Sequence, residues 1–207
     1  MSRATSGRSW HQGLTRPAVI AEALRILDDE GRDALTMRRL AALLDVEAPS
    51  LYAHIGSKDD LIDGVLDSVL DTVVLPPVGP DVRASLIAGF ASYRRALLRH
   101  PAVVVLMTER ARFSSAQLRL VRRSIELLES AGLSTRSAVD AHVTMIAFVL
   151  GFVLQEVSRP SGSAAGGLAP DPLLTRVLAT LAERGVDERF EVGLGLILDG
   201  VGVPDQR

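Results

Sequence analysis

The segment from Ala48 to Ala53 combines small side chains with one hydroxyl-bearing aromatic residue. If the segment is a short helix, five of its residues can face outward together: Ala48, Pro49, Ser50, Tyr52 and Ala53. Most of these side chains are small, so the backbone that carries them can approach the edges of DNA bases closely. Leu40, Leu43, Val46 and Leu51 are apolar and can hold this helix at a fixed angle to the preceding one. Such a pair of helices, joined by a tight turn, is typical of a helix-turn-helix.

Residues that enzymes use for acid–base or nucleophilic catalysis are scattered through this sequence. The four histidines stand at positions 11, 54, 100 and 142, and the chain has no cysteine. The sequence contains no His-x-x-x-His motif and no set of paired inward carboxylates. We therefore expect no catalytic residues, no metal site and no cofactor. A helical-bundle enzyme or carrier is the less favoured alternative.

The composition is that of a folded chain without a general affinity for nucleic acid. Apolar residues make up 47% of the 207 residues and charged residues 23%, as in globular proteins. With a formal net charge of −2, any surface for nucleic acid must be local. The longest uncharged helical run, residues 141–155, is shorter than the roughly 20 residues of a membrane span. In the absence of a recognisable signal sequence, we expect a cytoplasmic protein that does not enter a membrane.

Helical periodicity and capping residues predict helices throughout the first third of the chain. Thr15 is a candidate N-cap and Gly31 a candidate stop for the first helix, and Ser57 with Asp60 resembles a capping box. The predicted helices cover residues 16–30, 36 to about 44, 48–54 and 57–71.

The rest of the chain is also predicted to be helical, with no strand pattern. The segment "LPPVGP", residues 75–80, cannot continue a helix and marks an internal boundary. Asp81 opens a helix that Pro101 should break, and the composition of residues 158–172 predicts a loop. Further helices are predicted from Ser114 or Ser115 to Gly132, from Ser134 to Val157, and on either side of Gly185. Asp171 is the candidate cap of the helix before Gly185, with Pro172 as its first residue.

The sequence "LTMRRLAALLDVEAPSLYAHIGSKDDLIDGV", residues 35–65, resembles the DNA-binding domain of the TetR family of bacterial transcriptional regulators. The likeness continues weakly through "YRRALLRHP" and "LGFVLQE". It implies an all-α protein with an arm at 1–13, a helix-turn-helix domain at 14–60, and a ligand-binding and dimerisation domain at 61–207. It also implies a homodimeric repressor that a small, partly apolar effector releases from double-stranded operator DNA. A regulator without a small ligand, or one that responds to a protein partner, is the alternative.

The family pattern implies two kinds of DNA contact. Base or groove-edge contacts are expected from Arg38, Ala48, Pro49, Ser50 and Ala53, and phosphate contacts from Thr36, Tyr52, His54 and Lys58. As alternatives, Tyr52 can be a core aromatic and His54 a plain solvent-exposed residue. Arg39 is expected to pair with an acid.

Two positions depart from the family pattern. Asp45 stands where members commonly have glycine, and aspartate tolerates the left-handed conformation that such a turn needs. Ala48 replaces an amide side chain of the tetracycline-binding members, so the operator is expected to differ from theirs.

The second domain is expected to hold the effector among apolar side chains and a few polar groups. Each candidate can alternatively be plain core; the candidates are Phe90, Tyr93, Met107, Arg110, Phe113, Leu118, His142, Met145, Phe148, Phe152 and Gln155. Met107 and Gln155 stand where tetracycline-binding members hold magnesium with histidine and glutamate, so a magnesium–tetracycline chelate is not expected here. The helix around residues 141–154 and the final helix are expected to form the dimer interface.

Overall fold

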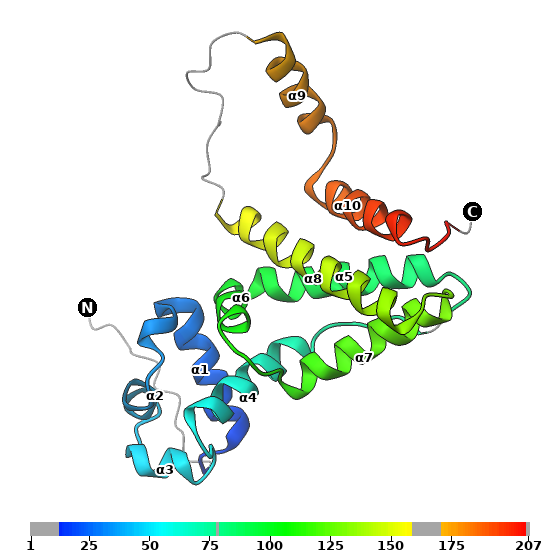
Figure 1. Cartoon of the computed structure of the whole chain (residues 1–207). Coiled ribbons are helices and arrows are strands. Elements are labelled where there is room, and N and C mark those ends of the chain that lie inside the picture. Colours follow the sequence, from blue (N-terminus) through cyan, green and yellow to red (C-terminus); the bar gives the residue numbers. More distant parts are fainter. Residues whose placement is uncertain (1–12, 78, 159–170, 206–207) are drawn as a thin grey trace. The chain divides into compact units, whose positions relative to one another are not determined.

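The computed structural model describes residues 13–77, 79–158 and 171–205. Within these ranges it contains ten α-helices, one short 3₁₀ helix and no strand, so the all-α prediction is confirmed (Figure 1). The chain divides into two compact units: one comprises the described residues up to Thr72 together with Ala102–Gln117, and the other comprises Val73–Pro101 and the residues from Leu118 onward. The domain boundaries expected from the sequence stay predictions.

The first unit begins with the helix that supports the others. In α1 (Arg16–Glu30), Thr15 caps the N-terminus by accepting from the Ala18 amide, and Gly31 ends the helix with φ at 83°. A 3₁₀ turn (Arg32–Ala34) leads into α2 (Met37–Leu43), where Thr36 accepts from the Arg39 amide. The bounds of α1 and both capping residues agree with the prediction.

The turn after α2 sets the direction of the next helix. Asp45 has φ of 54°, the left-handed conformation expected for this position. The helix α3 (Ala48–Tyr52) follows and ends two residues earlier than predicted, and α4 (Lys58–Leu70) begins after Ser57. The buried side chains of Leu40, Leu44 and Leu51 belong to the core that fixes α3.

The short helix α6 (Pro101–Thr108) was not predicted. Pro101 was expected only to break the preceding helix, but proline is also favourable as the first residue of a new one. The eight residues of α6 are mostly apolar and show no helical alternation of polar and apolar types, which is why periodicity did not reveal it.

The second unit consists of long helices. They are α5 (Val82–Arg99), most of α7 (Ser115–Ser130), α8 (Thr135–Val157), α9 (Pro172–Glu183) and α10 (Val186–Gly200). Asp81, Ser134 and Asp171 cap α5, α8 and α9 as their positions in the sequence predicted. The core of this unit forms where α8 packs against α5 and α10.

The helix α8 is long and apolar enough to cross a membrane by length and composition alone. A third of its most apolar window is buried against other helices. Core helices of helical bundles satisfy the same criteria, and the packing of α8 on α5 and α10 is that of a core helix.

Candidate nucleic-acid interface and internal cavity

The residues predicted to contact DNA lie outside the core of the first unit. Thr36, Arg38, Pro49, Ser50, Tyr52, Ala53 and Lys58 are exposed, and Ala48 and His54 are half-buried. The Tyr52 side chain is 53% exposed, so it is not a core aromatic. In contrast, Leu51 and Ile55 are buried. The short helix α3 therefore exposes small and polar side chains, while the buried Leu51 and Ile55 attach this segment to the core.

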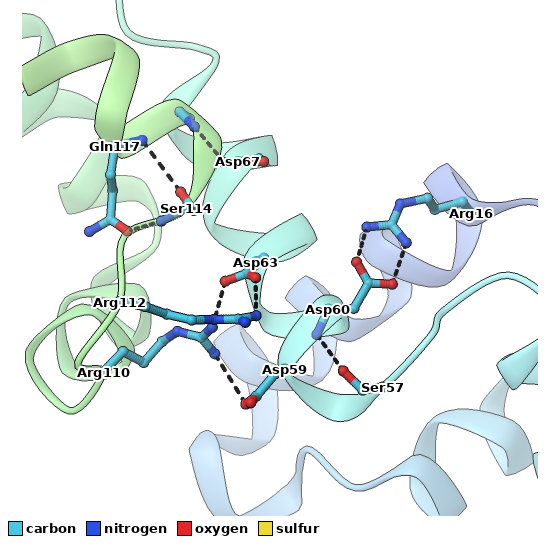
Figure 2. A network of polar contacts seen from close by, with 11 residues as sticks. Arg16, Ser57, Asp59, Asp60, Asp63, Asp67, Arg110, Arg112, Ser114 and Gln117 are labelled. Atoms are coloured by element: carbon cyan, nitrogen blue, oxygen red, sulfur yellow. Dashed lines mark hydrogen bonds and ion pairs between the residues drawn. The ribbon is translucent and has the colours of Figure 1, made fainter. Parts of the chain in front are cut away.

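Arg16 holds the C-terminal end of α3 against α4. Its Nη1 donates to the carbonyl oxygen of His54 at 3.2 Å and to Asp60 Oδ2 at 2.7 Å, while Nη2 donates to Asp60 Oδ1 at 2.7 Å. Figure 2 shows this two-pronged contact between α1 and α4. Since Arg16 is the first residue of α1, one guanidinium joins α1, the turn that follows α3, and α4.

The start of α4 is an organised set of hydrogen bonds. Ser57 Oγ accepts from the Asp60 amide at 3.0 Å, and Asp60 Oδ2 accepts from the Gly56 amide at 2.8 Å. The Arg16 guanidinium, followed by the Gly56 amide, lowers the pKa of Asp60 to about 2. Lys58, the first residue of α4, is exposed beside these amides, a position at which a phosphate group can be bound.

The neighbouring residues Arg38 and Arg39 have different surroundings. Arg39 donates to both carboxylate oxygens of Glu30, at 3.0 and 2.8 Å, as expected. Arg38 makes no hydrogen bond or ion pair with any residue in the described part of the chain. Its guanidinium is therefore available to a partner outside the protomer.

Three aspartates of α4, spaced four residues apart, contact the segment that follows α6. Asp63 binds both Arg110, at 2.5 Å, and Arg112, and Asp59 lies 3.6 Å from Arg110. Asp67 accepts from the Ala116 amide at 2.7 Å, in the first turn of α7. These contacts, shown in Figure 2, attach residues 110–116 to α4 within the first unit.

The second unit contains a small internal cavity. Its volume is about 40 Å³, which is room for a few water molecules. The residues that line it come from α5, α7, α8 and the segment before α5: Val73, Leu75, Pro76, Ser85, Leu86, Gly89, Phe90, Tyr93, Leu120, Arg123, Ser124, Leu127, His142 and Ile146. We call residues 73–76 the strap. This segment follows α4 in the chain and forms one side of the cavity.

Only part of the predicted ligand set lines this cavity. Phe90, Tyr93 and His142 do so. Met145 is buried in α8 without lining the cavity, and Leu118, Phe113 and Gln155 are exposed. Arg110 is bound to Asp63, and the half-buried Met107 belongs to α6.

Phe148 and Phe152 belong to a separate aromatic cluster. Phe152 and Phe190 contact Arg94, whose Cζ lies 5.4 Å from the Phe152 ring centre and 4.9 Å from that of Phe190, and Phe148 stacks on Phe190 at 5.5 Å. Arg94 also pairs with Glu156 at 2.6 Å, which compensates the burial of its charge. This cluster joins α5, α8 and α10 and has a structural role.

Two polar residues of α7 that line the cavity, Arg123 and Ser124, were not predicted from the sequence. Ser124 lies between Leu120 and Leu127 at helical spacing, so a serine within an apolar stripe was the available signal. Arg123 Nη2 donates to the Pro76 carbonyl at 3.0 Å, and Ser92 Oγ accepts from the Val74 amide at 2.8 Å. These two bonds fasten the strap. Among the described residues, no group of three or more potential metal ligands occurs.

The exposed sides of α8 and α10 carry large apolar residues. On α8 these are Val139, Val143, Leu154 and Val157, and on α10 they are Val192 and Leu196. Val143 is 59% exposed and Leu196 is 68% exposed. Exposed apolar residues gathered on two helices are typical of a protein–protein interface.

Comparison with known proteins identifies relatives of both parts of the chain. The family described as "Bacterial regulatory proteins, tetR family" matches residues 19–65, and "Tetracyclin repressor-like, C-terminal domain" matches residues 76–203. The chain is 35% identical over 193 residues to the tetracycline repressor protein class A from transposon 1721 of Escherichia coli, with 88% of each chain covered.

Two solved structures are similar to this fold. ActR from Streptomyces coelicolor in complex with actinorhodin is 32% identical, with a TM-score of 0.76 over 91% of this chain and 97% of ActR. BioQ with its double-stranded DNA operator is 29% identical, with a TM-score of 0.68 over 93% of this chain and 100% of BioQ.

Proposed function

Because the chain belongs to the TetR family of bacterial regulators, we propose that its DNA-binding surface is α3 with its flanking residues, and that its ligand site is the cavity beside α7. It is a DNA-binding transcriptional repressor and not an enzyme. We propose that a small-molecule ligand controls it, and the ActR complex with actinorhodin supports this proposal. The observation that supports the DNA assignment is the exposed surface of small residues on α3. The buried Leu51 anchors this helix in the core, and Arg16 binds the His54 carbonyl just after its end. As a soluble DNA-binding protein, it is inferred to act in the cytoplasm.

The exposed residues divide into groups that can contact bases and groups that can hold phosphates. Arg38 has a free guanidinium fork and can donate two hydrogen bonds to a guanine, and Ser50 can hydrogen-bond to several bases. The side chains of Ala48, Pro49 and Ala53 allow close approach and can meet thymine methyl groups. Thr36, Tyr52, His54 and Lys58 can fix the register on the backbone without distinguishing sequence.

The protein acts as a dimer, as members of its family do. A dimer presents two α3 helices to two half-sites of an operator. We infer that the exposed apolar residues of α8 and α10 form this interface, because they are the long helices of the second unit that combine a buried face with an exposed apolar one. In a symmetric dimer the same surface of each protomer is buried.

Ligand control requires that the cavity and α3 share a two-state equilibrium. We infer that two chain segments connect them. The strap continues directly from α4, and α7 carries both the Ala116 amide bound by Asp67 and the cavity residues Leu120 and Ser124. A ligand that favours one arrangement of α7 and the strap then changes the population of the α4 arrangement that binds DNA.

A mobility-shift titration against the DNA upstream of the protein's own gene tests operator binding. We expect a shift in the nanomolar range that unlabelled specific DNA removes and scrambled DNA of equal length does not, since specific binding exceeds nonspecific binding about 10³-fold or more. Equal competition by both DNAs would contradict a sequence-specific regulator acting there.

A repressor that needs no small ligand is the second candidate, and the small volume of the cavity favours it. A thermal-shift screen of small aromatic compounds distinguishes the two. A compound that raises the melting temperature and also releases the operator supports ligand control. Stabilisation without any release supports the second candidate.

A further inference from the structure

We propose that Ser124 and His142 are the paired polar anchors of the cavity and that they select an uncharged, largely apolar ligand carrying a hydroxyl group. The inference rests on the proposed ligand-controlled function and goes beyond it in naming the anchors and the ligand chemistry. It concerns this chain's own residues, since Ser124 was not among the ligand residues expected from the sequence.

Two buried polar atoms of the cavity wall are unsatisfied. Among the described residues, neither Ser124 Oγ nor His142 Nδ1 has a hydrogen-bond partner. Both residues are only 8% exposed, and both line the cavity. A buried polar atom without a partner destabilises the fold, so such groups in a protein commonly mark a place where a ligand or water supplies the missing bond.

Regular helices hold the two groups in place. Ser124 lies on α7 between the cavity-lining residues Leu120 and Leu127, and His142 lies on α8 one turn before Ile146. The imidazole is also fixed by the Phe90 ring, whose centre lies 6.2 Å from its own. Both residues therefore belong to an otherwise apolar lining and sit at defined positions on rigid elements.

The charges around the cavity exclude a cationic ligand. The described lining residues include no aspartate or glutamate, and their one permanent charge is the Arg123 guanidinium. That guanidinium already donates to the Pro76 carbonyl and lies 3.9 Å from Glu126. A ligand cation would enter with no acid to neutralise it, and burial of an unpaired charge is unfavourable.

A hydroxyl group fits both anchors. A neutral imidazole nitrogen either donates or accepts, depending on the tautomer, and a serine hydroxyl can do both. A ligand hydroxyl can also donate and accept, so it can satisfy Nδ1 in either tautomer, and it can equally bond to Ser124 Oγ. The remaining lining, which includes Leu86, Phe90 and Leu127, requires the rest of the ligand to be apolar.

The experiment compares two small neutral probes of nearly equal size and shape, phenol and toluene, on the full-length protein. Affinities are measured by calorimetric titration with wild type, Ser124→Ala and His142→Leu. We expect wild type to bind phenol roughly tenfold more tightly than toluene, because a buried hydrogen bond contributes about that factor. Each variant should reduce this preference several-fold, and benzylammonium should bind wild type more weakly than either neutral probe.

Ser130→Ala is the matched control. Ser130 lies on the same helix but its hydroxyl already donates to the Leu127 carbonyl at 2.7 Å, and the residue does not line the cavity. It should keep the full preference for phenol. A measurement without any ligand supports the pair: Ser124→Ala removes an unsatisfied hydroxyl and should melt at or above the wild-type temperature.

Three results would overturn the proposal: equal wild-type affinities for the two neutral probes, an unchanged preference in both variants, or no saturable binding of either probe. Operator binding is measured on every variant in parallel. If it persists while the probe preference is absent, the anchor assignment fails and the DNA-binding function stands. If operator binding is absent in wild type, the proposed function itself fails.

Discussion

Arg38 and Arg39 are adjacent arginines with different surroundings. We expect Arg38 to contact DNA and Arg39 to contribute to the fold alone. Arg39 is bound to Glu30, while Arg38 has no partner among the described residues. We expect Arg38→Ala to weaken binding to the specific operator by about 1–3 kcal/mol and to relax the base preference at one position. Arg39→Ala should leave that preference intact. Binding to a panel of operators with single base changes provides the measurement.

Tyr52→Phe should behave differently from Arg38→Ala. Removing an exposed hydroxyl that we propose to hold a phosphate should weaken binding to all sequences by a similar factor, about five- to tenfold. The same operator panel tests this expectation. If the two variants changed base preference equally, the division between positioning and base-contacting residues would be wrong.

His142 predicts a pH dependence of stability. Burial lowers the pKa of its imidazole below the ordinary value, so the folded protein binds this proton less readily than the unfolded chain. The free energy of unfolding is therefore unaffected by this group above about pH 6.5. It declines as the pH falls below that value, by up to about 1.4 kcal/mol per pH unit, because the unfolded chain binds the proton first. Urea unfolding of wild type and His142→Leu at pH 7.5 and 5.5 should show a smaller decline in the variant. Parallel declines would contradict a buried neutral histidine.

At the scale of elements, we expect the position of α3 to depend on Arg16, a residue of α1 that is distant from α3 in the sequence. Arg16→Gln removes the bidentate contact with Asp60 and the bond to the His54 carbonyl. Because the pair is partly exposed, we expect a loss of at most about 1 kcal/mol of stability. We also expect weaker binding to every operator tested, since α3 is less well fixed.

Arg25→Gln is the control for this change. Arg25 also lies on α1, but its ion pairs with Glu22 and Asp29 stay within that helix. It should leave operator affinity unchanged. An equal effect of both variants on DNA binding would show that Arg16 acts through α1 stability alone.

Capping chemistry explains why most elements were predictable from the sequence. Thr15, Ser57, Ser134 and Asp171 accept from backbone amides in the structure as their residue types and positions indicated. The helix α6 was not predictable in this way, because its first residue is a proline and its short apolar run has no period. Local signals fix helix ends, whereas α6 is defined by burial of its apolar side chains.

The cavity shows a second limit of sequence reasoning. Residue type alone suggested Phe148 and Phe152 as ligand contacts, but neither lines the cavity, and both pack in the aromatic cluster with Phe190. Which aromatic side chains line a cavity depends on the rotation and packing of three helices, which no spacing in one helix determines. Ser124 was missed for the same reason.

At the scale of the whole molecule, operator binding should depend on dimerisation through α8 and α10. Val143→Glu or Leu196→Glu places a charge in the inferred interface, where its desolvation is unfavourable. We expect monomers in analytical ultracentrifugation and roughly 100-fold weaker operator binding, because the second half-site contact is no longer intramolecular.

Leu118→Glu is the matched control for the dimer variants. The exposed fraction of Leu118, 54%, is similar to the 59% of Val143. Leu118 lies on α7, however, and does not line the cavity. It should remain dimeric and bind DNA normally. Dimers of normal affinity in both interface variants would refute the assignment of α8 and α10.

Lys58, the first residue of α4, is the one lysine among the 23 basic residues of the sequence. Because it is exposed at the proposed phosphate-binding end of that helix, the chain offers amine-specific reagents a single side chain, and that side chain lies on the functional surface. The rate at which an amine-specific reagent modifies Lys58 should therefore report operator occupancy. Bound operator should slow the reaction and its release should restore it, so no engineered label is required.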